Sequence, residues 1–315
     1  MGNKTDLIIV GAGIVGLATA WRAHHQGRRV HVIDRATRPV GASIQNFGHA
    51  CFTAQADAIQ DVAADSRDGW KTAAAETGLW AAQPGTVAPA VSETEMTVLR
   101  QFHDHRGSEQ VTLLSANDTR ERLGLTGSEN SGTGDIIGGA LLPLDMRVNP
   151  REAAPRLAEW LAANGVEFSW NTAVHHVEDG QVDTSRGTLS ADEVVVYPGH
   201  HVGDSHDYEQ SPEPFIQQSI ADLLMDNASA YLGIEHPVVR QRWQGRYADS
   251  PNTNLVLERP DDRTAVAVVA SGIGMTVSFG IATLITEHRD APDFLTVFTV
   301  SSSATNRRVA AVYCG

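Results

Sequence analysis

The sequence lacks long hydrophobic runs and has few cysteines. None of its 315 residues lies in a segment that approaches the roughly 20 consecutive apolar residues of a membrane-spanning helix, so we expect no membrane span. The two cysteines, Cys51 and Cys314, lie far apart and have neither metal-site nor disulfide spacing. The N-terminus also lacks the apolar core of a signal peptide. These absences predict a protein of a reducing compartment, by default the cytoplasm, without a bound metal.

Basic residues are also scarce. The chain has 24 Lys and Arg against 38 Asp and Glu, which gives a formal net charge of -14 at pH 7. This charge argues against nucleic acid or an anionic membrane as a partner, because both repel an acidic surface. A chain of this length can bury roughly three quarters of its unfolded surface, which permits one large or two interlocked domains. The oligomeric state stays open, since no feature of the sequence specifies it.

The segment from residue 6 to residue 34 has the spacing of a dinucleotide-binding motif. The apolar, β-branched residues 7–10 predict a buried parallel strand, and a G-x-G-x-x-G pattern follows. Gly11 permits the tight turn, Gly13 lets a diphosphate approach the backbone, and Gly16 lets the next helix pack against the strand. The sequence therefore predicts a nucleotide-binding strand, turn and helix.

The elements after the glycines complete this motif. Ile14 and Val15 open the helix, whose N-terminal N–H groups and positive dipole end would face the diphosphate. A second strand delivers Asp34 about 20 residues further on, where its carboxylate can accept hydrogen bonds from ribose hydroxyls. Arg35 could favour an NADP phosphate or lie over the adenine. The motif by itself does not separate FAD from NAD.

The loop of residues 41–49, GASIQNFGH, consists of small and polar residues that can wrap closely around a ligand. An ordinary surface turn is its alternative interpretation. Together with residues 11–34, the loop resembles the D-amino-acid-oxidase-like FAD-dependent oxidoreductases, and within them the branch associated with aminophosphonate catabolism. The resemblance implies that this loop lies along the diphosphate and the ring of FAD. It assigns to cofactor binding Ala42, Ser43, Asn46 and Gly48.

A second glycine-rich turn follows a predicted buried strand at residues 264–270. It would present another helix N-terminus, with roughly half a positive charge, to an electron-rich group. The resemblance implies that this group is the pyrimidine edge of the reduced flavin, and it adds positions near the adenine and the rest of the cofactor. The residues assigned on this ground are Gly272, Ile273, Gly274, Met275, Thr276, Val174 and Gly199.

Two separate glycine-rich turns, one for a diphosphate and one for a ring, fit FAD better than NAD. We therefore predict FAD as the cofactor, and the resemblance implies an oxidoreductase that transfers a hydride from the carbon beside a small amine to flavin. Water would hydrolyse the resulting imine and molecular oxygen would reoxidise the flavin, while the protein orients the substrate and stabilises negative charge on the ring. The alternatives are a truncated flavin-binding remnant without turnover and an NAD(P)-dependent dehydrogenase.

The substrate is predicted to be an amino acid or an aminophosphonate, whose anion needs a cation. An arginine offers two parallel hydrogen bonds to such a group, and residues 238–247 resemble the family's Arg-x-Trp-x-Gly segment. A histidine could set the protonation state of the amine, and a tyrosine could bind the substrate. Surface ion pairs, solvated histidines and simple packing remain the alternatives. The candidates are Arg147, Arg242, Arg246, His49, His206 and Tyr247.

The expected fold is α/β, with a Rossmann-like FAD-binding domain built on a parallel sheet and an interleaved, partly truncated antiparallel-sheet substrate domain. The truncation is inferred at residues 199–206, where the chain lacks several strands that the resembling family has. The expected boundaries are 1–77, 146–202 and 262–291 for the FAD-binding domain, 78–145 and 203–261 for the substrate domain, and 292–315 for an irregular tail.

Overall fold

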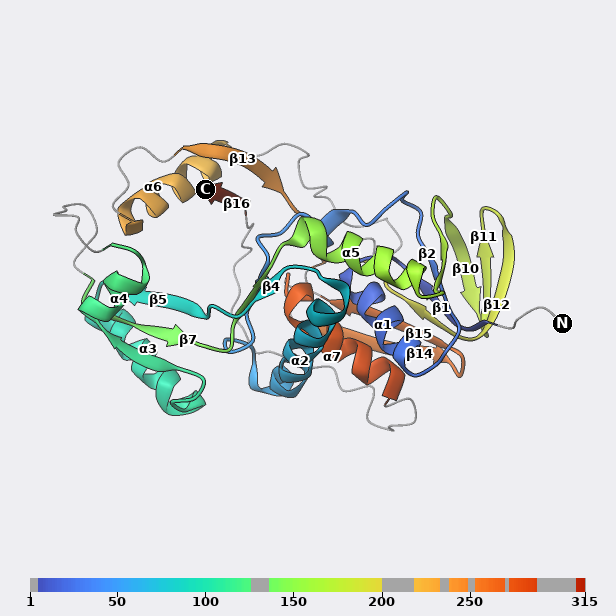
Figure 1. The fold of residues 1–315 in the computed structure, drawn as a ribbon, viewed down its shortest axis with the longest axis horizontal. Helices are drawn as coiled ribbons and strands as arrows, with labels where there is room; N and C mark the ends of the chain where they lie inside the picture. The colour runs from blue at the N-terminus through green and yellow to red at the C-terminus, as the bar shows by residue number, and fades with distance from the viewer. Residues whose placement is uncertain are drawn as a thin grey trace.

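The computed structural model describes residues 5–125, 136–199, 218–232, 238–248, 253–269, 272–287 and 310–314. Its largest unit is an eight-stranded sheet with helices packed beside it (Figure 1). The strands of this sheet are β1 (Thr5–Val10), β2 (Val30–Ile33), β9 (Glu167–Ser169), β10 (Val174–Glu178), β11 (Gln181–Thr184), β12 (Gly187–Val196), β14 (Leu255–Asp261) and β15 (Thr264–Val269).

The centre of the sheet is parallel, as predicted. Strand β1 lies between β2 and β12, β9 continues beyond β2, and β15 continues beyond β12. Strands β10, β11 and the first half of β12 are antiparallel, and so are β14 and β15. Ile8 and Ile9 of β1 pair with Val194 and Val195 of β12, and all four are buried, as expected for strands covered on both faces. The carboxyl ends of β1 and β12 therefore meet beside the first glycine-rich turn.

Four helices pack on one another beside this sheet: α1 (Ile14–His25), α2 (Gln60–Thr77), α5 (Pro150–Ala163) and α7 (Gly274–Glu287). Helix α7 contacts both α1 and α2. The approach to α2 needs a glycine, because a Cβ on Gly280 would lie 2.0 Å from the carbonyl oxygen of Val62. Trp70 Nε1 of α2 donates a hydrogen bond to the carbonyl oxygen of Met275, at 2.7 Å. The first turn of α7 is thus fixed by its contacts with α2.

There are two smaller antiparallel three-stranded sheets: the one with β5 and β7 lies at the left of Figure 1, and β4 of the other lies near the centre, in contact with α2. Helices α3 and α4 pack on the sheet made by β5, β7 and β6, and short 3₁₀ turns interrupt the connecting loops. The elements are β3 (His49–Ala50), β8 (Met146–Val148) and β4 (Ala81–Ala82) in one sheet, β5 (Thr86–Ala90), β7 (Gly138–Leu142) and β6 (Thr112–Ser115) in the other, with α3 (Glu93–Arg106), α4 (Ala116–Arg122), η1 (Gly41–Ser43) and η2 (Asp57–Ile59).

Helix α6 (Gln218–Leu232) and strand β13 (Val239–Gln244) lie near the end of the chain in Figure 1. Strand β13 pairs antiparallel with β16 (Ala310–Cys314), so the predicted irregular tail contains a strand. The predicted boundary at residue 262 falls inside the β14–β15 hairpin, because β14 pairs with β15 and belongs to the large sheet. Most of the junction predicted to be shortened lies outside the described residues.

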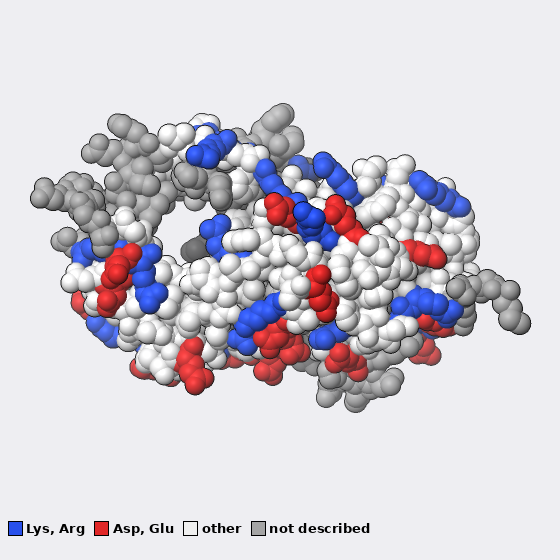
Figure 2. Space-filling view, viewed as in Figure 1, with Lys and Arg blue, Asp and Glu red and all other residues white. Residues whose placement is uncertain are grey.

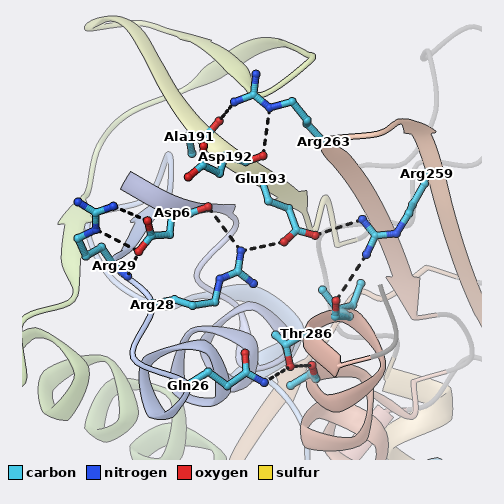
Figure 3. A network of polar contacts seen from close by, with 12 residues as sticks. Asp6, Gln26, Arg28, Arg29, Ala191, Asp192, Glu193, Arg259, Arg263 and Thr286 are labelled. Carbon is cyan, nitrogen blue, oxygen red and sulfur yellow. Dashed lines mark hydrogen bonds and ion pairs between the residues drawn. The ribbon is translucent and has the colours of Figure 1, made fainter. Parts of the chain in front are cut away.

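A buried carboxylate connects the large sheet to its surroundings (Figure 3). Glu193 of β12 is 1 % exposed and accepts hydrogen bonds from Arg28 Nη2 at 2.8 Å and Arg259 Nη1 at 3.1 Å. Arg28 follows α1 and Arg259 lies on β14, so one side chain ties three segments together. A buried acid is tolerated here because it is paired on both oxygens.

The surface shows no large area of one charge on the face drawn in Figure 2, where acidic and basic residues are interspersed. Among the described residues, every helix is too short or too polar to cross a bilayer.

Candidate functional site

A cavity of about 300 Å³ lies where the two glycine-rich turns meet. Its wall contains the N-terminal ends of α1 and α7, the loop around η1, the end of β12 and the segment after β13. The structure thus brings together segments that are up to about 260 residues apart, as the FAD prediction requires. The predicted cofactor residues that line the cavity are Gly13, Ile14, Val15, Gly16, Ala42, Ser43, Asn46, Gly199, Gly272, Gly274 and Met275.

The first turn has the geometry that its glycines were predicted to provide. Gly11 has a φ of +109°, and a Cβ on it would lie 2.5 Å from the carbonyl oxygen of Tyr197. A Cβ on Gly16 would lie 2.0 Å from the carbonyl oxygen of Gly11, so no side chain fits between helix and turn. The chain therefore requires glycine at both positions.

Gly13 and Ser43 face each other at the start of α1. A Cβ on Gly13 would lie 3.1 Å from Ser43 Oγ, and this hydroxyl accepts a hydrogen bond from the backbone N–H of Ile14 at 2.9 Å. The missing side chain leaves a cradle at a helix N-terminus, which favours an anionic group. These residues fit the diphosphate of FAD, because Ser43 can also donate its hydroxyl proton to an anionic oxygen.

Asp34 holds the same turn from the end of β2. Its Oδ2 accepts from the backbone N–H of Ala12 at 2.7 Å, and its Oδ1 accepts from that of Ala36 at 2.8 Å. Each carboxylate oxygen can accept more than one hydrogen bond. The contacts seen are therefore compatible with the predicted ribose contact, which stays a prediction.

Seven of the predicted cofactor residues do not line the cavity: Gly11, Asp34, Arg35, Gly48, Val174, Ile273 and Thr276. Several of them shape its surroundings. A Cβ on Gly48 would lie 2.0 Å from the carbonyl oxygen of Val148, and Thr276 Oγ1 accepts from the backbone N–H of Cys51 at 3.1 Å. Arg35 is exposed. Direct contacts of these residues with the cofactor remain predictions.

The predicted substrate-binding residues agree less well with the structure than the predicted cofactor-binding residues do. Tyr247 lines the cavity together with Trp243 and Gly245, whereas Arg242 and Arg246 do not. Neighbouring residues of an extended strand point to opposite sides, so in β13 Trp243 faces the cavity and Arg242 does not. Arg242 Nη1 instead donates to Gln218 Oε1 at 2.8 Å.

The other substrate candidates lie elsewhere. Arg147 is exposed on β8, His49 is outside the cavity lining, and His206 falls outside the described residues. Within the described part of the chain, the cavity lining contains no charged side chain. The sequence missed the lining residues Gln45, Phe47, Tyr197, Trp243, Gly245, Ala248, Ala267 and Val269. Gln45, Phe47, Trp243 and Gly245 lie in segments that the sequence analysis singled out, but they were not assigned individually. Tyr197, Ala248, Ala267 and Val269 belong to no recognised motif.

Tyr197 closes the cavity beside the first turn. Its hydroxyl lies 2.5 Å from Thr19 Oγ1 of α1, and burial raises the pKa of Tyr197 far above its ordinary value. The phenol is therefore neutral at physiological pH and can hydrogen-bond without adding charge.

A polar network surrounds His49 next to the cavity. His49 Nε2 lies 2.8 Å from Thr86 Oγ1 and 3.3 Å from Asp145 Oδ2. Asp145 is 1 % exposed, and its Oδ1 accepts from the backbone N–H groups of Phe52 at 3.0 Å and Thr53 at 3.1 Å. Burial raises the pKa of Asp145, but hydrogen bonds from His49, Thr53 and Thr86 outweigh it, and the pKa lies below its usual value. The carboxylate is therefore ionised at neutral pH.

Cys51 joins this network and completes a possible metal-binding set. The ligand atoms of His49, Cys51 and Asp145 lie within 4.8 Å of one another. Burial, followed by the charge of Asp145, raises the pKa of the Cys51 thiol to about 11. A protonated thiol is a poor metal ligand, and one oxygen of Asp145 already accepts two backbone hydrogen bonds. These contacts favour a hydrogen-bonded network over a metal centre.

Comparison with known proteins identifies the family. Residues 6–208 match the DAO family, described as FAD dependent oxidoreductase. The chain belongs to this family. The description of the family names FAD, the cofactor predicted from the two turns, so the FAD prediction is confirmed.

Solved structures show the same fold. L-proline dehydrogenase from P. horikoshii has a TM-score of 0.75 and 17% identity, covering 94% of this chain and 96% of that chain. Glycine oxidase from Bacillus cereus has a TM-score of 0.73 and 16% identity, covering 96% of this chain and 100% of that chain. The predicted α/β class with parallel and antiparallel sheets is thereby confirmed, whereas a shortening of the chain is not.

A curated relative matches a much smaller part. Squalene monooxygenase SE1 from Panax ginseng is 45% identical over 53 residues, which are 16% of this chain and 10% of that protein. The matching stretch thus spans about a tenth of that relative's length.

Proposed function

We propose that the protein oxidises a small amine, either an amino acid or an aminophosphonate, to an imine, with molecular oxygen as the final electron acceptor. The observation that carries this proposal is the cavity between the N-terminal ends of α1 and α7. The family supplies the FAD dependence. The names of neighbouring structures, L-proline dehydrogenase, L-amino acid deaminase and glycine oxidase, support an amino-acid-like substrate.

Bound FAD would supply the hydride acceptor. The N-terminal N–H groups of α7 face the cavity through Gly274 and Met275 and would stabilise negative charge beside them. Trp243, Tyr247 and Phe47 form an aromatic part of the wall that keeps water from the reacting carbon. His49 would accept the proton of the substrate ammonium group, because an amine must be neutral before it can lose a hydride.

The anion of the substrate needs a partner near this aromatic wall. Arg246 stands between Gly245 and Tyr247, which both line the cavity, so it is the first candidate. Arg147 is the second, because its β8 strand pairs with β3 and places it opposite His49. His206, which lies outside the described residues, stays a sequence-based candidate for setting the protonation state of the amine and not for binding the anion. We expect the residue that binds the anion to affect KM more than flavin retention.

One observation favours a second candidate function, a flavin-binding protein without turnover. The described lining of the cavity carries no charged side chain, and an amino acid or aminophosphonate carries two charges. An active enzyme therefore needs a cation from outside that lining, whereas a remnant does not.

Anaerobic reduction separates the two candidates. The purified protein should show the visible absorbance of flavin, and glycine, sarcosine, D-alanine, L-proline, 2-aminoethylphosphonate and its N-methyl derivative would be added without oxygen. Bleaching by at least one amine, followed by recovery in air, supports the proposed oxidation. Bleaching by the phosphonates alone supports the aminophosphonate branch. Bound flavin that no amine bleaches contradicts catalysis of this kind and favours the remnant, and absence of flavin contradicts both.

A further inference from the structure

Asp145 is a buried carboxylate that neither the motifs nor the family match assigns to a role. It lies in the turn between β7 and β8, where Oδ1 accepts hydrogen bonds from the backbone N–H groups of Phe52 and Thr53. Its own backbone carbonyl accepts from the N–H of Gly85. These contacts fix the carboxylate between the loop that carries His49 and the substrate-side sheet.

The second oxygen of Asp145 faces the ring of His49. Oδ2 lies 3.3 Å from Nε2, and Thr86 Oγ1 lies 2.8 Å from the same nitrogen. An ionised carboxylate can only accept, so Nε2 must carry the proton when it binds Asp145. Within the described residues, Nδ1 of His49 forms no hydrogen bond. The network therefore selects one tautomer and leaves the other nitrogen with its lone pair.

We propose that Asp145 is a positioning residue that holds His49 in the Nε2–H tautomer, so that Nδ1 accepts the proton of the substrate ammonium group. This role rests on the proposed amine oxidation. In the step, one ammonium N–H bond breaks, the proton goes to Nδ1, and the electron pair stays on the amine nitrogen. The imidazolium that forms keeps its Nε2–H toward the carboxylate, which stabilises the positive charge.

The position of His49 supports this role. Phe47, two residues before it, lines the cavity, and the centroids of the two rings are 6.1 Å apart. Cys51, two residues after it, is bound through its backbone N–H to Thr276 in the first turn of α7. His49 is thus held between the aromatic wall and the second glycine-rich turn.

Other groups around His49 act less directly on its protonation. Arg147 is its Cα partner on β8, with an exposed side chain. Cys51 is a neutral thiol at physiological pH, since its pKa is raised to about 11. The hydroxyl of Thr86 on β5 contacts the ring, and the hydroxyl of Thr276 on α7 contacts the backbone of Cys51; neither hydroxyl titrates. Asp145 is the charged group that contacts the ring.

The test is an NMR measurement of the His49 tautomer in the flavin-loaded protein without substrate, with His49→Gln used for assignment. The ¹⁵N shifts of the ring should show the Nε2–H tautomer in the wild type. In Asp145→Asn the amide keeps one oxygen for Phe52 and Thr53 but presents an N–H₂ group to Nε2. The ring should change to the Nδ1–H tautomer, because the amide N–H₂ group can only donate to Nε2.

Asp57→Asn is the matched control. Asp57 binds His105 through both oxygens at 3.0 Å on the exposed surface, so this substitution changes an Asp–His pair elsewhere. It should leave the tautomer of His49 unchanged.

Two results would overturn the proposal: an Nδ1–H tautomer in the wild type, or an Asp145→Asn protein with the tautomer of the wild type. If Asp145→Asn does not fold, the wild-type tautomer alone decides. With an amine that bleaches the flavin, an unchanged pH profile of kcat/KM in Asp145→Asn also contradicts the proposal. An Nε2–H tautomer without bleaching by any amine supports the positioning by Asp145 and contradicts the proposed function instead.

Discussion

The two sides of the cavity are built by different means. On the cofactor side, Gly13 and Ile14 follow β1 directly, Ser43 comes from the next loop, and the contacts among them are made by backbone or by a short side chain. On the substrate side, Trp243 and Tyr247 come from the segment after α6 and lie across the cavity from α1. The first side depends on local backbone geometry and the second on how distant segments pack. A substitution on the cofactor side should therefore reduce flavin binding, whereas one on the substrate side should reduce kcat/KM and leave flavin bound.

The largest effect is expected from Gly13→Val. The added side chain would start 3.1 Å from Ser43 Oγ and fill the cradle at the N-terminus of α1. We expect complete loss of flavin after purification, measured as the ratio of visible to ultraviolet absorbance. Ala64→Val, an exposed position of α2, is the control and should retain flavin. A Gly13→Val protein that keeps its flavin would contradict the diphosphate assignment.

The next largest effect is expected on the stability of the eight-stranded sheet, to which Glu193 belongs. Glu193→Gln removes the charge that pairs with Arg28 and Arg259, and it leaves both cations partly buried without that charge. We expect the free energy of unfolding, from urea denaturation, to fall by about 3 kcal/mol, as when one partner of a buried ion pair is removed. Glu178→Gln, at an exposed pair with His176, should change it little. Equal stability of the two variants would show that the buried network does not stabilise the sheet.

A smaller effect is expected on the substrate side. Tyr247→Phe removes one hydroxyl from the cavity wall and leaves the ring in place. We expect kcat/KM for the active amine to fall roughly fivefold, about the contribution of one hydrogen bond, with flavin absorbance unchanged. Loss of flavin in this variant would place Tyr247 on the cofactor side and remove the distinction between the two walls.

The smallest effect is expected on the pH dependence of the free energy of unfolding, through the buried carboxylate of Asp145. The pKa of Asp145 is lowered in the folded protein, so its contribution to stability is complete above the unfolded pKa of about 4 and disappears as the pH falls through the folded value. The difference in unfolding free energy between wild type and Asp145→Asn should therefore be larger at pH 7 than at pH 3. A difference that grows toward acid would mean that the carboxyl is protonated in the native state.

Much of the fold and of the cofactor side could be predicted from the sequence because their signals are local. The strand at residues 7–10, the turn at Gly11 and the helix that starts at Ile14 are encoded within about 15 residues, and each restricts the backbone of the next. The second turn at Gly272 was predicted in the same way. Both turns were then found in the wall of one cavity.

The substrate side could not be predicted to the same degree. Arg242 belongs to a recognisable segment, yet alternation along the extended chain turns it away from the cavity that Trp243 and Gly245 line. Asp145 belongs to no recognised motif. It contacts His49, 96 residues earlier in the sequence, because β8 pairs with β3. Strand register decides such contacts, and register depends on the whole sheet.

The sequence by itself determined where a diphosphate can approach the backbone and that a second helix N-terminus would follow near the end of the chain. It could do so because glycine spacing constrains backbone dihedrals within a few residues. Only the tertiary structure decided which side chains complete the site, among them Tyr197, Val269 and the pair of His49 with Asp145. These side chains meet through long-range strand pairing and helix packing, and no local pattern in the chain specifies those distances.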